Sequence, residues 1–341
     1  MASVLPGDGD PPAVIITDPV PFLGHPVALV DREQLRVTQH GRTLMVPDHL
    51  QAITVPSPPS AFDLSQNDAV KLPILGNDRQ GDCYMAAALH IVQLMRWNAI
   101  KEQVNWNVSD VLKWYNHLSG GDRGLGDQQI FPDWKRGELG PAGPFKILDW
   151  MTIRPSDDAS IDLGMWAFNG VLFTMSLPGS WHSNAAPNVI WSANNASRPI
   201  GGHAVILYGK NPVGNRILGT WGIQPGIQLT RDGLLAVDPE IVVVFSLDMF
   251  DKTGIAPCCG LDYTALAALW QQLGGKPLPP SPFGPPPPPP PPDSPVAPNT
   301  IRLLKALKAG ANGDFVLGSD LPPGDYECVL SGDGPPPVVP G

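Results

Sequence analysis

A run of eight consecutive prolines at 285–292 divides the sequence into a long part and a short part. Proline lacks a backbone N–H and fixes φ, so the run can form neither a helix interior nor a central strand. Polyproline II geometry makes it a stiff spacer of roughly 25 Å, at about 3.1 Å per residue. We therefore expect a linker over 276–298, a domain before it and a small tail over 299–341.

The part before the prolines has its own divisions. Residues 1–24 are rich in Pro, Gly and Asp, which predicts a flexible N-terminal arm. Residues 25–60 contain alternating apolar residues followed by a Pro-rich hinge, which predicts a small β extension. This extension either packs on the main domain or forms a cover over it. The main domain is expected over 61–275.

Within the main domain, helical patterns come before β patterns. Apolar spacing predicts helices over 83–97 and 108–118, the second with Asn107 or Ser109 as its N-cap. A short helix is expected over 263–273. Aliphatic and β-branched runs predict strands over 171–176, 203–208, 216–221, 234–237 and 241–247. Helices followed by an antiparallel sheet favour an α+β fold with a cleft between the halves.

Cys83 stands at the start of the first expected helix, after a turn of small and polar residues. Unpaired N–H groups and the helix dipole favour a thiolate at such a position. His203 follows two glycines and opens an aliphatic strand. This pattern is typical of nucleophilic catalysis in which an imidazole takes a thiol proton. The alternative is a small buried cysteine and an unrelated core histidine.

The residues around this pair resemble the papain-like cysteine peptidases, most closely the calpain-like and phage-encoded branches. In that family a Gly-rich turn precedes a Cys–aromatic pair, as before Cys83 here. The family also has a glycine six residues after the His and a Trp–Gly eighteen residues after it, as at Gly209 and Trp221 here. The resemblance implies a papain-like fold that hydrolyses peptide or isopeptide bonds without a cofactor. Acyl transfer to an amine is a further option, because a thioester intermediate can be intercepted by an amine.

The resemblance also implies an oxyanion site. The family uses a glutamine six residues before the cysteine, a position that Asn77 occupies here. Its amide offers the same kind of N–H donor on a shorter side chain. Gln80 has the family's side chain at a different offset and is the second candidate. Asn77 in a simple turn leading into the helix is the alternative.

One family position is vacant in this sequence. The asparagine that orients the imidazole falls at Gly219, which has no side chain, while Trp221 is expected to cover the ring. The orienting role is then open to Gln224, to Asn211 or Asn215, or to a backbone carbonyl. Because this vacancy permits a catalytically weak or inactive scaffold, a binding or structural role is the alternative function.

Composition restricts the partners. A net charge of −10 and a pI near 5.0 argue against nucleic-acid binding. The sequence lacks an apolar run of the roughly 18 residues that a membrane span needs, and its first residues do not resemble a signal peptide, so a cytoplasmic location is expected. The cysteines, two adjacent at Cys258 and Cys259, lack zinc-site spacing, so no metal is expected. A peptide or protein substrate is expected, and the Pro-rich linker or the tail can serve as a site for a protein partner.

Overall fold

The computed structural model describes residues 57–138 and 145–284, together with Val30 and short strands toward both ends of the chain. The chain divides into two compact units, Met1–Pro285 and Pro286–Gly341. The proline run lies outside the described residues. Among the helices that are described, none combines the length and the apolar character needed to cross a membrane.

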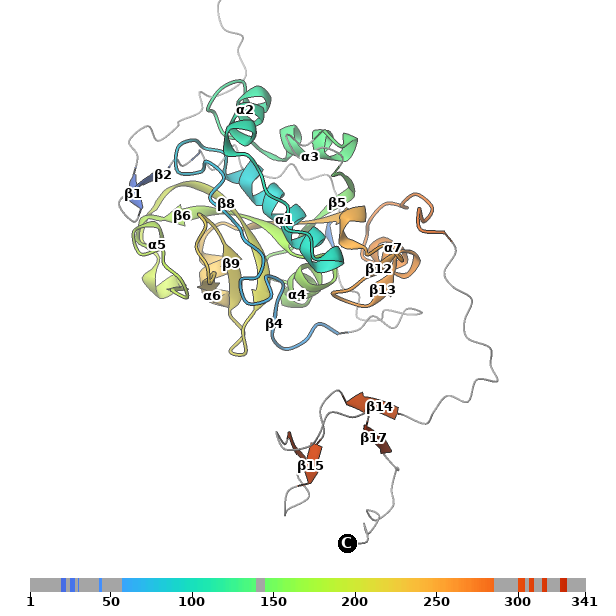
Figure 1. Ribbon diagram of the computed structural model, residues 1–341. Helices are drawn as coiled ribbons and strands as arrows, with labels where there is room; N and C mark the ends of the chain where they lie inside the picture. Colours follow the sequence, from blue (N-terminus) through green and yellow to red (C-terminus); the bar gives the residue numbers. More distant parts are fainter. Residues whose placement is uncertain are drawn as a thin grey trace, which may run out of the picture. The chain divides into compact units, whose positions relative to one another are not determined.

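The first unit is built on a nine-stranded mixed sheet (Figure 1). Its order is β3-β5-β11-β6-β8-β9-β10-β7, and β4 also pairs with β8. The pairs are antiparallel except for β3 with β5 and β10 with β7. The strands are β3 (Thr43–Leu44), β4 (Phe62–Asp63), β5 (Ile147–Ile153), β6 (Val171–Pro178), β7 (Ile190–Trp191), β8 (Pro199–Lys210), β9 (Arg216–Gly219), β10 (Ile227–Leu229) and β11 (Glu240–Ser246).

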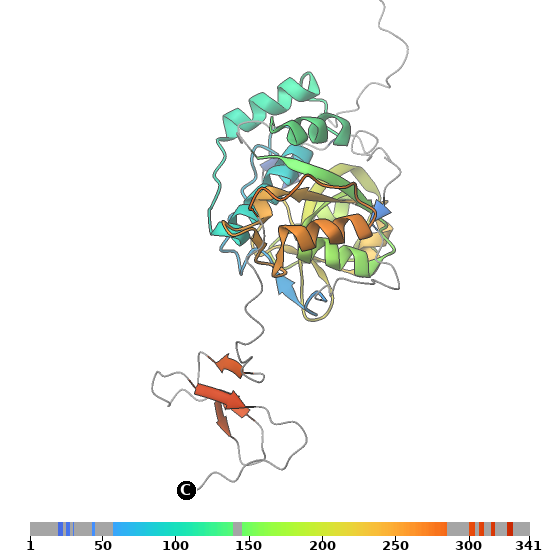
Figure 2. The same cartoon turned by 90° about the vertical axis from the view of Figure 1, so that its right-hand side faces the viewer.

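Helices and short turns surround this sheet. Most residues of α1 are buried, and the helix packs against β8. Figure 2 shows α7 lying over the sheet, where Trp270 meets Phe245 of β11 edge to face with ring centroids 5.6 Å apart. The helices are α1 (Cys83–Ile100), α2 (Val108–Ser119), α3 (Asp127–Arg136), α4 (Asp158–Ala167), α5 (Gly179–Ser183), α6 (Arg231–Ala236) and α7 (Tyr263–Gln272), with 3-10 turns at Ala193–Asn195 and Leu247–Met249. A small hairpin joins β12 (Ile255–Ala256) to β13 (Leu261–Asp262).

The arrangement confirms the expected α+β fold, with two local corrections. The strand expected over 234–237 is wrong, because these residues belong to α6 and its end. Thr230 caps that helix by accepting a hydrogen bond from the Gly233 amide at 3.2 Å, a start signal that outweighs the β-branched composition. His203 also does not open its strand, because β8 begins at Pro199 and includes the two glycines before His203.

Close backbone approach explains a glycine of the motif. A Cβ on Gly209 would lie 2.7 Å from the carbonyl oxygen of Phe62, so a side chain there would displace β4 from β8. The N-cap of α2 is Asn107, whose Oδ1 accepts from the Ser109 amide at 2.9 Å. Gly209 and Asn107 thus owe their identities to local backbone geometry.

The N-terminal residues contribute short elements. Strand β1 (Val20–Phe22) pairs with β2 (His25–Val27), and β1 lies within the segment expected to be a flexible arm. Val30 forms an isolated bridge to the main sheet, and β3 adds to the edge of β5. The rest of the expected arm, extension and hinge up to residue 56 lies outside the described residues.

The expected start of the linker at 276 differs from the structure. The Lys276 amide donates to Asp149 at 3.2 Å, and the Tyr263 hydroxyl donates to the Pro279 carbonyl at 2.8 Å. The Phe283 ring packs against Phe250 at 5.5 Å. Residues 276–284 therefore belong to the first unit. In the second unit, β14 (Thr300–Leu303) pairs with β17 (Tyr326–Val329), and β15 (Leu307–Ala309) pairs with β16 (Phe315–Leu317).

Candidate active site

Cys83 is the first residue of α1, and its side chain is buried. A tight loop leads into the helix, with Gly76 at φ +104° accepting hydrogen bonds from the Arg79 and Gln80 amides. Cys83 and Ala204, the residue after His203, line the same small pocket, and α1 packs against β8. The nucleophile candidate therefore lies against the part of β8 that carries the base candidate.

His203 is completely buried, and the residue that orients it is Thr220. His203 Nε2 lies 2.7 Å from Thr220 Oγ1. Within the described residues, Nδ1 of the same ring has no hydrogen-bond partner. Nδ1 is thus the ring nitrogen that is left for a proton transfer. Thr220 was missed from the sequence, although it directly precedes the Trp221 of the motif.

Two aromatic rings complete the surroundings of His203. Trp221 stacks on the imidazole with ring centroids 4.4 Å apart and an interplanar angle of 19°. His182 of α5 meets the indole of Trp221 edge to face at 5.3 Å. Trp221 therefore covers the imidazole as expected. His182 was also missed from the sequence, where nothing in its spacing separates it from other histidines.

Burial sets the protonation states of the pair. Burial raises the pKa of the Cys83 thiol to about 12, although hydrogen bonds from backbone amides, Ala204 among them, favour the thiolate. Burial, and to a smaller extent the nearby His182, lower the pKa of His203 to about 3. The covered pair is therefore neutral, which corrects the expected ion pair. Desolvation outweighs the helix N-terminus here, because both charged forms would lose their hydration.

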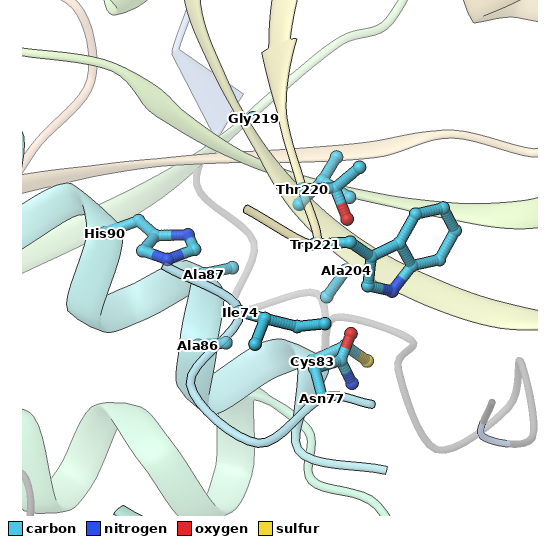
Figure 3. Close-up of a pocket in the computed structure, with 11 residues that line it drawn as sticks. Ile74, Asn77, Cys83, Ala86, Ala87, His90, Ala204, Gly219, Thr220 and Trp221 are labelled. Atoms are coloured by element: carbon cyan, nitrogen blue, oxygen red, sulfur yellow. The ribbon is translucent and has the colours of Figure 1, made fainter. Parts of the chain in front are cut away.

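The two oxyanion candidates differ in what they contact. Asn77 lines the same small pocket as Cys83, together with Thr220 and Trp221 (Figure 3). Its Nδ2 also donates to the Gln80 carbonyl at 3.2 Å. The Gln80 side chain instead accepts from Asn116 of α2 at 2.8 Å and does not line this pocket. The geometry favours Asn77 as the oxyanion donor. The Gln80 side chain instead connects its loop to α2.

The residues suggested as substitutes for the missing asparagine do not contact His203. Gln224 Nε2 donates to the Val70 carbonyl at 2.6 Å, which corrects its expected supporting role. Asn211 and Asn215 bind each other's backbone and the Gln228 side chain in the β8–β9 turn. At Gly219, a Cβ would point toward Leu72, Ile206 and Tyr208, away from the imidazole.

Other His and Cys side chains lie near the pair or elsewhere in the first unit. His90 of α1 lines the same pocket as Cys83, is buried, and has its Nε2 2.8 Å from the Pro73 carbonyl. Cys258 and Cys259 are free thiols. In the part of the chain that the structure describes, no three His, Cys, Asp or Glu side chains come together in a way that could hold a metal ion.

Comparisons with solved structures find several proteins that are similar to this chain at low sequence identity. Xylellain, a cysteine protease from Xylella fastidiosa, is 15% identical, with a TM-score of 0.46 over 62% of this chain and 94% of its own. A Carica candamarcensis cysteine protease in complex with E-64 is 16% identical, with a TM-score of 0.42 over 55% of this chain and 98% of its own. Digestive procathepsin L2 proteinase from Tenebrio molitor is 12% identical, with a TM-score of 0.42 over 62% of this chain and 80% of its own.

No protein-family model matches the sequence, and no curated protein matches it. At TM-scores below 0.5, the likeness to solved structures carries no argument about chemistry. The chemistry of this chain is therefore derived from the contacts of Cys83, His203 and Thr220.

Proposed function

We propose that this protein is a papain-like thiol peptidase that hydrolyses peptide or isopeptide bonds through Cys83 and His203. The observation that carries the proposal is the contact of His203 Nε2 with Thr220 Oγ1 at 2.7 Å, at a pocket that Cys83, Thr220 and Ala204, the residue after His203, line together. A nucleophile, a base and a group that orients the base are the three parts that thiol catalysis needs.

Each residue has a stated role in this reaction. Thr220 Oγ1 accepts a hydrogen bond from Nε2–H, so Nδ1 keeps the lone pair that takes the thiol proton. The Cys83 thiolate attacks the substrate carbonyl carbon, and the resulting oxyanion accepts hydrogen bonds from the Cys83 backbone amide and from Asn77 Nδ2. His203 then protonates the leaving amine, and water hydrolyses the thioester. Trp221 shields the imidazole from bulk water, which strengthens the contact to Thr220.

The inactive scaffold was the alternative because the position of the orienting asparagine holds glycine. Thr220 supplies a hydrogen-bonding oxygen to the same imidazole, so the main reason for that alternative is removed. The neutral state of the pair is compatible with catalysis. Burial raises the pKa of the Cys83 thiol, and exposure of this thiol to water would return its pKa toward the ordinary value.

A peptidyl fluoromethylketone tests the proposal, since it alkylates a cysteine only where an active-site histidine assists. The full-length protein is expected to gain one adduct on Cys83, located by peptide mass spectrometry. His203→Gln should suppress that adduct while leaving the thermal midpoint within a few degrees of the wild-type value. An adduct that forms equally fast in the His203→Gln protein would contradict the proposed pair.

A further inference from the structure

The turn between β12 and β13 carries Cys258 and Cys259, two free thiols that the proposed peptidase reaction does not use. The Cys259 and Gly260 amides close this turn by donating to the Ala256 carbonyl, at 3.2 Å and 2.8 Å. Cys259 is buried in the hydrophobic core, and the partly exposed Cys258 packs against the same core. The turn therefore directs two adjacent thiols toward one core, whereas neighbouring side chains of a strand would point to opposite faces.

A buried amide lies at one of these two sulfurs. Asn169, between α4 and β6, is completely buried, and its Nδ2 donates to Cys258 Sγ at 3.4 Å. Among the described residues, Oδ1 of the same side chain has no hydrogen-bond partner. The backbone of Asn169 is left-handed, with φ +63°, a conformation that glycine adopts without burying an amide. The contact with Cys258 therefore explains this buried side chain better than the backbone conformation does.

The surroundings of the two thiols favour the loss of a proton from the pair. An N–H donor at a sulfur stabilises the thiolate relative to the thiol, and Asn169 supplies such a donor to Cys258. The side-chain contact with Cys258 also lowers the pKa of the Cys259 thiol. Each sulfur thus has a neighbouring group that stabilises its thiolate, which is the reactive form in thiol–disulfide exchange.

We propose that Cys258 and Cys259 form a reversible redox modification site, which reacts with low-molecular-weight disulfides such as glutathione disulfide and closes into a disulfide between the two adjacent residues. The Cys258 thiolate attacks one sulfur of glutathione disulfide, whose S–S bond breaks, and one glutathione thiolate leaves. The Cys259 thiolate then attacks Cys258 Sγ, so the mixed disulfide breaks and the second glutathione thiolate leaves. The two cysteine protons pass to the released thiolates, and the two electrons lost by the protein reduce glutathione disulfide.

Exposure sets the order of the two steps. Cys258 is partly exposed, whereas Cys259 is only 8% exposed, so the external disulfide reaches Cys258 first. The mixed disulfide then lies beside Cys259, whose attack is intramolecular and has a high effective concentration. A second glutathione disulfide molecule would have to reach the buried sulfur of Cys259 from solution. Ring closure is therefore faster than double modification, and it does not depend on the proposed peptidase function.

The test treats the reduced full-length protein with excess glutathione disulfide at about pH 8, near the ordinary thiol pKa. Acid quenching and mass spectrometry then follow the peptide that carries both cysteines. We expect this peptide to lose two hydrogen atoms, to carry no glutathione at the end of the reaction, and to be restored by dithiothreitol. Cys259→Ser should stop with one glutathione on Cys258, and Cys258→Ser should gain its adduct at least about tenfold more slowly, because the remaining sulfur is buried.

The amide is tested by Asn169→Gly, which keeps the left-handed backbone and removes the donor. The matched control is Asn188→Gly, the same change at an exposed residue with φ +59°. Asn169→Gly should raise the pH midpoint of the disulfide-formation rate by about one unit, and the control should not shift it. Should Asn169→Gly fail to fold, the cysteine variants decide.

A wild-type peptide that ends with two glutathiones, or that stays unmodified, would overturn the inference. Equal rates of adduct formation in the Cys258→Ser and Cys259→Ser proteins would overturn the order of the two steps. An unchanged pH midpoint in folded Asn169→Gly would remove the amide from the site.

Discussion

Thr220 Oγ1 lies 2.7 Å from His203 Nε2 and takes the place of the orienting amide that the sequence lacks at Gly219. A hydroxyl carries no charge and accepts a weaker hydrogen bond than a carboxylate does. The contact therefore positions the ring but adds little stabilisation to its protonated form, and burial lowers the pKa of His203 to about 3.

Removal of the Thr220 hydroxyl should reduce catalysis without unfolding the protein. Thr220→Val keeps the shape and is expected to lower kcat/KM by about 10- to 100-fold, whereas Thr220→Ser should retain most of it. The measurement is the pH profile of kcat/KM for both variants. A purely structural role would give equal losses in the two variants, with no change in the acid limb of the profile.

Introduction of the family's asparagine at Gly219 should fail to improve activity. A Cβ there would lie 3.1 Å from Ile206 Cγ1 and 3.2 Å from Leu72 Cδ1, so the new side chain would enter the core. Gly219→Asn is expected to lower the free energy of unfolding by about 1–3 kcal/mol, as overpacking does, and Gly219→Ala by less. Urea unfolding measures both values, and a Gly219→Asn enzyme that is faster than wild type would show that the amide reaches His203.

Substitutions of the two oxyanion candidates should have different effects, one on kcat and the other on stability. Asn77→Ala is expected to lower kcat by roughly 10²- to 10³-fold, the usual cost of one oxyanion donor. Gln80→Ala loses a hydrogen bond to Asn116, so its effect should be on stability, by about 1 kcal/mol, with kcat nearly unchanged. Steady-state kinetics with thermal melts would reject the assignment if the two effects were exchanged.

His90 should make the domain sensitive to acid. Burial lowers the pKa of His90 to about 4 from an ordinary 6.5, so the unfolded chain takes up a proton that the folded chain does not. The stabilisation is complete above pH 6.5 and is lost as the pH falls toward 4, by about 2 kcal/mol between pH 7 and pH 5. His90→Gln keeps a donor for the Pro73 carbonyl but cannot be protonated, so its thermal midpoint should fall less over this range. An identical loss in both proteins would show that His90 is not responsible.

The sequence predicts the α+β order of the elements, and it singles out Cys83 and His203 as the candidate pair. The helix start at Cys83 and the strand around His203 have strong local patterns, because a polar turn leads into a long apolar segment at the first and a continuous aliphatic run follows the second. Thr220, which contacts the His203 ring, was missed. The position of the orienting residue was counted back from Trp221 and fell on Gly219. Side chains alternate between the faces of a strand, so a shift of one residue moved the role to Thr220.

Contacts between residues that lie far apart in the chain could not be predicted from the sequence, for a different reason. The bridge from Val30 to Gly202 joins residues far apart in the chain, and no local pattern encodes it. The raised pKa of Cys83 depends on the same burial and reverses the expectation from the helix start alone. The docking of residues 276–284 was hidden by their Pro-rich composition, although Phe283 supplies an apolar anchor within them.

Turnover of a quenched fluorescent peptide library tests the central claim most directly. The full-length wild-type protein would be assayed beside the Cys83→Ala protein. We expect peptide cleavage that disappears with Cys83→Ala while the thermal midpoint stays unchanged. Cleavage that persists in Cys83→Ala would contradict this account, as would the absence of cleavage by the wild-type protein when Cys83 is fully accessible to iodoacetamide.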